Sequence, residues 1–242
     1  MSSRKPRRAL RALIVILLIL VGLGVAADRV GESLAEDRLA TAAATEAAQY
    51  DVSAADTSVE IGGFGFLPQV ARSKFDKVTL TMREPTIEKI PAENLTVEMH
   101  TIHVPRQALT GDRSAPVTVD KADLNLRLAP AGLLKLTTNP RGIDALKFQI
   151  VDGKLVGRVS IRGLEASAAI QPLPVNGRIG FVVDRSVLDN IPERLRSLVS
   201  SALARGIAVP ELPFNAQLQR ISVEGQSLVL TATATNLKLS GA

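Results

Sequence analysis

The chain has no cysteine and no tryptophan, and only one tyrosine and six phenylalanines among 242 residues. Without cysteine it forms no disulfide and offers no thiolate to a metal ion. Aromatic residues, at 3% of the chain, are too few for the stacking platform that binds single-stranded nucleic acid. An apolar interior must therefore consist mainly of Leu, Val, Ile and Ala, which suits acyl chains and an ordinary core equally well.

The excess of basic residues is confined to the N-terminus. The chain has 29 Lys and Arg against 24 Asp and Glu, a net charge of +5. Five basic residues precede the first acid and account for this excess: Arg4, Lys5, Arg7, Arg8 and Arg11. The remainder of the chain is neutral, which does not suit nucleic acid, so we expect no nucleic-acid partner.

An uninterrupted apolar run extends from Ala12 to Ala27. As a helix it is roughly 24 Å long, shorter than a hydrocarbon core of about 30 Å and longer than most signal-peptide cores. We interpret residues 1–27 either as a signal peptide cleaved after Ala27 or as an uncleaved signal anchor. The basic residues before the run predict an extracytoplasmic domain, either anchored at the outer face of the cytoplasmic membrane or exported.

Residues 28–50 are rich in Ala, Glu and Leu, and this composition predicts a helix. Its apolar stripe consists largely of small residues: Val30, Leu34, Ala35, Leu39, Ala42 and Ala43. The stripe either packs closely on a sheet or belongs to a spacer that holds the domain off the membrane. Residues 51–242 are predicted to form the main domain.

Most of the main domain alternates apolar and polar residues, which predicts roughly ten antiparallel strands. Asp152-Gly153 and Asn176-Gly177 predict tight hairpin turns with positive φ. The parity of the apolar residues changes between Val119 and Leu124. This change predicts a bulge or strand break near Lys121.

One stretch, Val187 to Leu203, has a clear helical stripe, formed by Leu188, Ile191, Leu195 and Leu198. A sheet of about ten one-sided strands must curl, split or close to bury its apolar face. The sequence therefore predicts an α+β fold: a long, strongly curved antiparallel sheet wrapped around this one amphipathic helix, with an N-terminal signal or anchor helix. Such a wrap leaves an apolar groove unless side chains fill it.

Few residues indicate chemistry. His100 and His103 lie three apart on a predicted strand, which sends them to opposite faces unless a bulge intervenes. We interpret them as a surface pair and not as a shared metal site. The common motifs of hydrolases, metalloproteases and nucleotide-binding loops are absent from the sequence. We therefore expect no enzyme activity, no catalytic or metal-binding residue and no cofactor.

A glycine- and phenylalanine-rich block runs from Val59 to Gln69. Its glycines permit a sharp turn whose backbone approaches a ligand, or a bulged strand end with two core aromatics. The block, the basic and apolar N-terminus, the Ala-rich helix and the later Glu211-Leu-Pro-Phe214 and Ile221-Ser-Val-Glu-Gly225 segments together resemble one family. It is the actinobacterial LmeA-type family of phospholipid-binding envelope proteins.

The resemblance implies an extracytoplasmic lipid-binding protein, similar to tubular lipid-binding folds, that serves as a carrier, sensor or accessory factor in cell-envelope lipid or glycolipid metabolism. It implies a phospholipid or lipoglycan precursor as the ligand. Within this interpretation we expect an entrance near Phe64, Phe66 and Leu67 and a groove floor formed by Leu188, Ile191, Leu195 and Leu198. Two alternatives remain: a structural or partner-binding module with a filled core, and an envelope enzyme that modifies a glycolipid.

Overall fold

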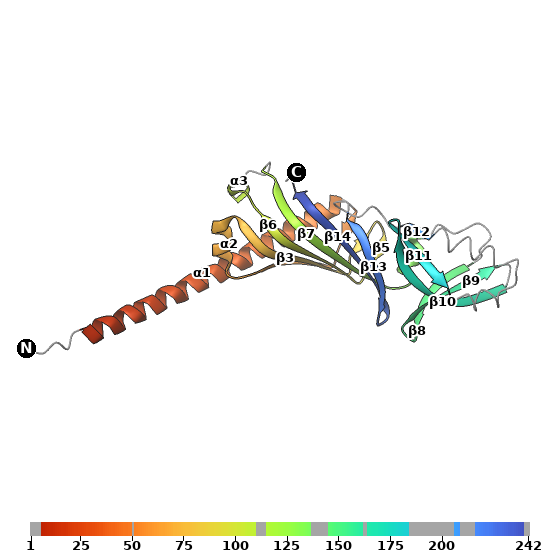
Figure 1. Cartoon of the computed structure of the whole chain (residues 1–242), viewed down its shortest axis with the longest axis horizontal. Coiled ribbons are helices and arrows are strands. Elements are labelled where there is room, and N and C mark those ends of the chain that lie inside the picture. Colours follow the sequence, from red (N-terminus) through yellow and green to blue (C-terminus); the bar gives the residue numbers. More distant parts are fainter. Residues whose placement is uncertain are drawn as a thin grey trace, which may run out of the picture.

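The computed structural model describes residues 6–49, 51–109, 115–136, 145–161, 164–183, 206–208 and 216–239. Within these ranges the chain forms one long helix, three short helices and three antiparallel sheets. Figure 1 shows the two larger sheets side by side along the length of the body, with the long helix beside the first of them. That helix, α1 (Pro6–Gln49), extends well beyond the body at its N-terminal end (Figure 1).

The largest sheet has six strands and carries most of the features described below. Their spatial order is β13 (Gln217–Glu224), β14 (Ser227–Leu239), β7 (Val117–Leu128), β6 (Asn94–His103), β3 (Lys74–Arg83) and β2 (Asp56–Gly62). All neighbouring strands in it are antiparallel. The long central strands therefore provide one broad face for the interior.

The second sheet has five strands, and the third is a short ribbon. The five are β12 (Ile207–Ala208), β11 (Arg178–Val183), β10 (Leu164–Val175), β9 (Lys154–Ile161) and β8 (Ala145–Val151). The ribbon contains β1 (Val52–Ser53), β4 (Thr86–Ile87) and β5 (Ile90–Pro91). The short helices are α2 (Phe66–Arg72), α3 (Arg106–Leu109) and α4 (Gly132–Leu136).

Two apolar clusters form the core on one face of the six-stranded sheet, which we call the inner face. The first lies between this sheet, the five-stranded sheet and α4, with Leu228, Leu133 and Ile179 among its buried members. The second lies near α1 and α2, which contribute Ala35, Phe66 and Val70 to a centre formed by the strands. The two cores therefore occupy different ends of the same inner face.

A row of irregularly paired residues crosses three neighbouring strands of this sheet, β6, β7 and β14. The regular pairing is interrupted at Thr101, Asp120 and Asn236, which lie side by side, and two of them, Thr101 and Asn236, have positive φ. Consecutive inward-facing residues on a strand are normally two positions apart, but across this row they are three apart, as with Met99 and Ile102 on β6. The predicted irregularity near Lys121 is confirmed, and it lets apolar residues face inward along the full length of the strands.

Both predicted hairpin turns are confirmed. Asp152 and Gly153 have φ of 51° and 71° between β8 and β9. Asn176 and Gly177 have φ of 49° and 71° between β10 and β11. Positive φ at both central positions gives a backbone twist that matches the flanking strands, which is why Asn-Gly and Asp-Gly are strong signals.

The α+β class and the antiparallel arrangement are confirmed, but the expected single wrapped sheet is not what the described strands form. They divide into separate sheets, because the chain leaves the six-stranded sheet after β7 through Pro130 and α4 before β8 begins. The helix expected at the centre, Val187 to Leu203, lies outside the described residues. In the part that is described, α1 and α2 are helices that pack beside the six-stranded sheet.

Helix α1 covers the free edge of β2. The backbone N–H of Ile61 donates a hydrogen bond of 2.7 Å to the carboxylate of Glu36, so a side chain from the helix satisfies an edge strand that would otherwise be open to pairing. The half-buried side of the helix carries Gly31, Ala35 and Ala43. The predicted stripe is therefore wrong in part, because its larger members, Val30, Leu34 and Leu39, are exposed.

Helix α1 is continuous through both N-terminal segments that the sequence separates, residues 1–27 and 28–50, as far as they are described. In the described part of the chain, no helix combines the length and the apolar character needed to cross a membrane.

Gly31 permits α1 to approach the phenylalanine block. A Cβ at this position would lie 3.4 Å from two atoms of the Phe66 ring, whereas a Cβ at Gly24 would meet nothing within 4 Å. We expect Gly31→Leu to lower the free energy of unfolding by about 1–3 kcal/mol through overpacking. The matched Gly24→Leu variant has the same gain in helix propensity and should show no loss. Urea unfolding followed by circular dichroism measures both, and equal stability of the two variants would contradict this packing.

Candidate functional site

The phenylalanine block forms a tight turn followed by a helix. Strand β2 ends at Gly62, and Gly63 and Gly65 then take φ of 114° and 70°, a conformation that favours glycine. Helix α2 begins at Phe66, and its Pro68 lies in the first turn, where the missing N–H costs nothing. The sharp turn that the glycines permit is therefore present, whereas α2 was not predicted.

Asp28 of α1 caps this short helix. Its carboxylate accepts hydrogen bonds from the backbone N–H groups of Phe66, at 3.0 Å, and Leu67, at 2.6 Å. The N-cap residue itself, Gly65, has no side chain to do this. The hydrogen bond from Leu67, and then that from Phe66, hold the pKa of Asp28 below its ordinary value. The charged carboxylate thus ties the block to the long helix.

Two further contacts fix the block from inside. The ring of Phe66 packs 6.2 Å from that of Phe75, centroid to centroid, and lies against Gly31 of α1. The buried side-chain amide of Gln69 donates to the carbonyl of Gly62 and accepts from the N–H of Asp76. The turn, α2 and the start of β3 are thereby held as one rigid unit.

The three residues expected near a groove entrance have different positions. Phe64 is 88% exposed and Leu67 45% exposed, whereas Phe66 belongs to the core cluster beside α1. The structure brings Phe64 and Leu67 to the surface and Phe66 to the interior. The four residues expected on the groove floor lie outside the described residues: Leu188, Ile191, Leu195 and Leu198. A lipid-binding role for all seven stays a prediction.

A strip of aliphatic side chains crosses the inner face between the two cores. We call it the central strip, and its members are Val59, Leu80, Leu95, Val97 and Leu126. They are neighbours on adjoining strands, since Val59 pairs with Leu80, Leu80 with Val97, and Leu95 with Leu126. All five are only half-buried. Among the described residues, Val59, Leu80 and Leu95 belong to neither core cluster.

The central strip has the chemistry of an acyl-chain surface. It is aliphatic throughout and lies on the inner face, next to Met82 and Leu124, which are buried. Covering partly accessible apolar area with another apolar group is favourable by roughly 25 cal/mol for each Å² removed from water. A hydrocarbon chain lying across β2, β3, β6 and β7 would provide that cover.

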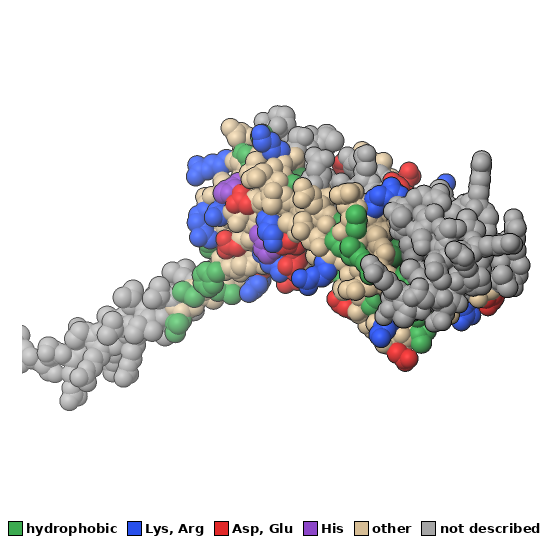
Figure 2. Space-filling model, turned by 45° about the vertical axis from the view of Figure 1, so that its right-hand side comes forward, with side chains coloured by type: hydrophobic (Ala, Val, Ile, Leu, Met, Phe, Trp, Pro, Cys, Tyr) green, Lys and Arg blue, Asp and Glu red, His purple; other side chains and the backbone are tan. Residues whose placement is uncertain are grey.

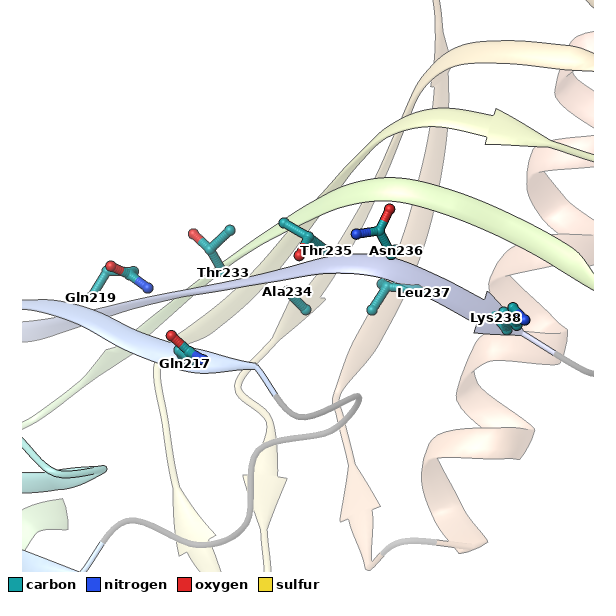
Figure 3. Close-up of a pocket in the computed structure, with 8 residues that line it drawn as sticks. All are labelled: Gln217, Gln219, Thr233, Ala234, Thr235, Asn236, Leu237 and Lys238. Atoms are coloured by element: carbon teal, nitrogen blue, oxygen red, sulfur yellow. The ribbon is translucent and has the colours of Figure 1, made fainter.

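A depression of about 510 Å³ lies along β13 and β14 and has a different character. Most of its lining side chains are amides and hydroxyls: Gln217, Gln219, Thr233, Thr235 and Asn236. Figure 3 shows Thr233, Thr235 and Asn236 on one side of β14 and Ala234 and Leu237 on the other. This polar surface does not suit a hydrocarbon chain.

The outer face of the six-stranded sheet is a network of paired charges. Lys77 lies 3.0 Å from Glu98, and Nζ of Lys121 lies 2.7 Å from Asp123. Partial burial raises the pKa of Asp123, but hydrogen bonds from Lys121 and Thr233 outweigh it and give a net lowering. Figure 2 shows charges of both signs interspersed over the body, which gives this face no net attraction for one sign of ligand.

Both histidines lie on this outer face. The irregular row at Thr101 intervenes between them, so the alternation that would place them on opposite faces does not apply. Nε2 of His100 lies 3.8 Å from a carboxylate oxygen of Asp123, and Nε2 of His103 lies 3.9 Å from one of Asp120. The interpretation as a surface pair is confirmed. In the described ranges, no group of three or more His, Asp or Glu is arranged to hold a metal ion.

Asp28 and Gln69, the two residues that hold the phenylalanine block, were not predicted from the sequence. Asp28 acts on backbone groups 38 and 39 positions away, and no local pattern reveals such a partner. A Pro68 placed two residues after the first helical position is the one local signal that could have indicated α2. The central strip was visible as alternation, but its partial exposure depends on where the two cores end.

The model of a family described as LmeA-like phospholipid-binding matches residues 26–233. No curated protein and no solved structure matches the chain.

The bond between Asp28 and α2 predicts a pH dependence of stability. The pKa of Asp28 is lower in the folded protein than in the unfolded chain. The charged carboxylate therefore stabilises the folded state at a pH above the ordinary pKa of Asp, and this stabilisation is lost as the pH falls through the folded pKa. Asp28→Asn should therefore be less stable than the wild type at neutral pH, and the difference should shrink on acidification. Urea midpoints over an acid series measure this. Asp37→Asn, at an exposed position of the same helix, is the control, and equal behaviour of the two variants would refute the cap.

Proposed function

Because the chain belongs to the LmeA-like phospholipid-binding family, we propose that it binds a phospholipid whose acyl chains lie on the central strip. The observation that carries this proposal is the half-buried aliphatic surface between the two cores. Of the residues that the structure describes, Val59, Leu80 and Leu95 pack into neither core. The strip is continuous over four strands, so it offers length as well as width to a hydrocarbon chain.

We infer a carrier, sensor or accessory role in cell-envelope lipid metabolism, outside the cytoplasmic membrane. Five basic residues before the apolar run support this orientation, since such residues stay on the cytoplasmic side. A phospholipid or a lipoglycan precursor fits the strip equally, because both present acyl chains. The polar depression on β13 and β14 is separate from the strip and is not needed for acyl-chain binding.

The proposal predicts that polar groups on the central strip reduce lipid binding. We expect Leu80→Asn combined with Leu95→Asn to lower the affinity for phosphatidylglycerol at least tenfold, because each lost Leu contact is worth about 1.5–3 kcal/mol when fully buried. The measurement is the amount of phospholipid that co-purifies with the full chain, extracted and quantified by mass spectrometry, together with transfer of a fluorescent phosphatidylglycerol.

Thr79→Asn combined with Thr81→Asn is the matched control, since these residues flank Leu80 on β3 but face the outer side. Circular dichroism should show that both double variants are folded. Unchanged lipid content in a folded Leu80→Asn, Leu95→Asn protein would reject the strip as the binding surface. Absence of any bound lipid from the wild type would favour a structural module with a filled core.

A further inference from the structure

The segment of α1 just outside the body is exposed and apolar around its circumference. Every residue from Val21 to Ala27 is exposed, and Leu18 is exposed before them. At 100° per residue, Leu23 lies about 140° around the helix from Leu18, and Val21 lies about 300° around it. Figure 2 shows these hydrophobic side chains where the helix leaves the body. No single face of the helix carries them.

The exposed part of the phenylalanine block lies at the same level of the helix. Asp28, which holds the start of α2, directly follows the exposed segment. The position of a Cβ on Gly65 would be 3.8 Å from Oδ2 of Asp28, which places the neighbouring Phe64 beside this turn. Leu67, the second exposed apolar residue of the block, donates its N–H to the same carboxylate.

We propose that Phe64 and Leu67 enter the surface of a lipid bilayer together with the exposed apolar segment of α1, Val21 to Ala27. A helix that is apolar on all sides requires an apolar environment on all sides, which a bilayer provides and a protein docked on one side does not. Phe64 is held on a rigid turn beside this segment, so it meets the same bilayer. The apolar face of an interfacial helix is typically buried roughly 5–10 Å into the boundary between headgroups and acyl chains. We expect a similar depth for Phe64 and Leu67, which we call the wedge.

This contact deepens the proposed function, on which it rests for the location at a membrane. The wedge and the central strip are different surfaces: Phe64 and Leu67 lie in the turn after β2 and at the start of α2, and the strip lies on the inner face of the sheet. Lipid binding by the strip and docking by the wedge can therefore be tested separately.

The absence of tryptophan provides a clean test. The Phe64→Trp variant of the full chain is reconstituted into vesicles of phosphatidylcholine and phosphatidylglycerol, with or without bromine on the acyl chains. We expect brominated lipid to quench the indole at position 64 at least twofold. Val182→Trp is the control, because Val182 is also exposed, at 53%, but lies on β11 in the five-stranded sheet. It should be quenched little.

Equal quenching of the two variants, or none at position 64, would overturn the docking. The same measurement in the Leu80→Asn, Leu95→Asn background removes the contribution of a lipid bound on the strip. Quenching at position 64 should persist there, and its loss would show that the indole reports a bound ligand and not the bilayer. If position 64 is quenched but wild-type protein carries no extractable lipid, the strip proposal fails and the docking stands.

Discussion

The contact between α1 and the edge of the six-stranded sheet is the constraint on which the other features depend. Three different interactions act along one side of the helix: Asp28 caps α2, Gly31 admits the ring of Phe66, and Glu36 binds the edge of β2. They are spaced along little more than two helical turns. Together they determine where the phenylalanine block lies and protect a strand edge that would otherwise be free to pair.

The division of the inner face follows from how the strands are built. The irregular row at Thr101, Asp120 and Asn236 lets apolar side chains continue inward beyond it, where they pack with α2 and α1. At the other end the five-stranded sheet and α4 form a second core. The central strip lies between these two regions. Within the ranges that the structure describes, Leu80 and Leu95 pack into neither core and stay half-buried.

The sequence predicts those features that depend on adjacent residues, and it does not predict those that depend on contacts with residues far away in the chain. Asn176-Gly177 predicts its hairpin because two adjacent residues determine the twist of the turn. The two phenylalanines of the block have almost the same local surroundings, yet Phe66 is packed and Phe64 is exposed, because a helix from elsewhere covers only the former. The stripe on α1 was misassigned for a similar reason: glycine and alanine, and not the larger leucines, permit a close approach.

The continuity of α1 has a mechanical consequence. Between Pro6 and Asp28 the helix rises about 33 Å without interruption, and Asp28, Gly31 and Glu36 clamp its other half to the sheet. The distance of the body from the N-terminal end of α1, and its rotation about the helix axis, are therefore fixed by the helix. One inserted residue would move the body by about 1.5 Å along the helix axis and rotate it by about 100°, so the length of this segment sets the direction in which the central strip faces.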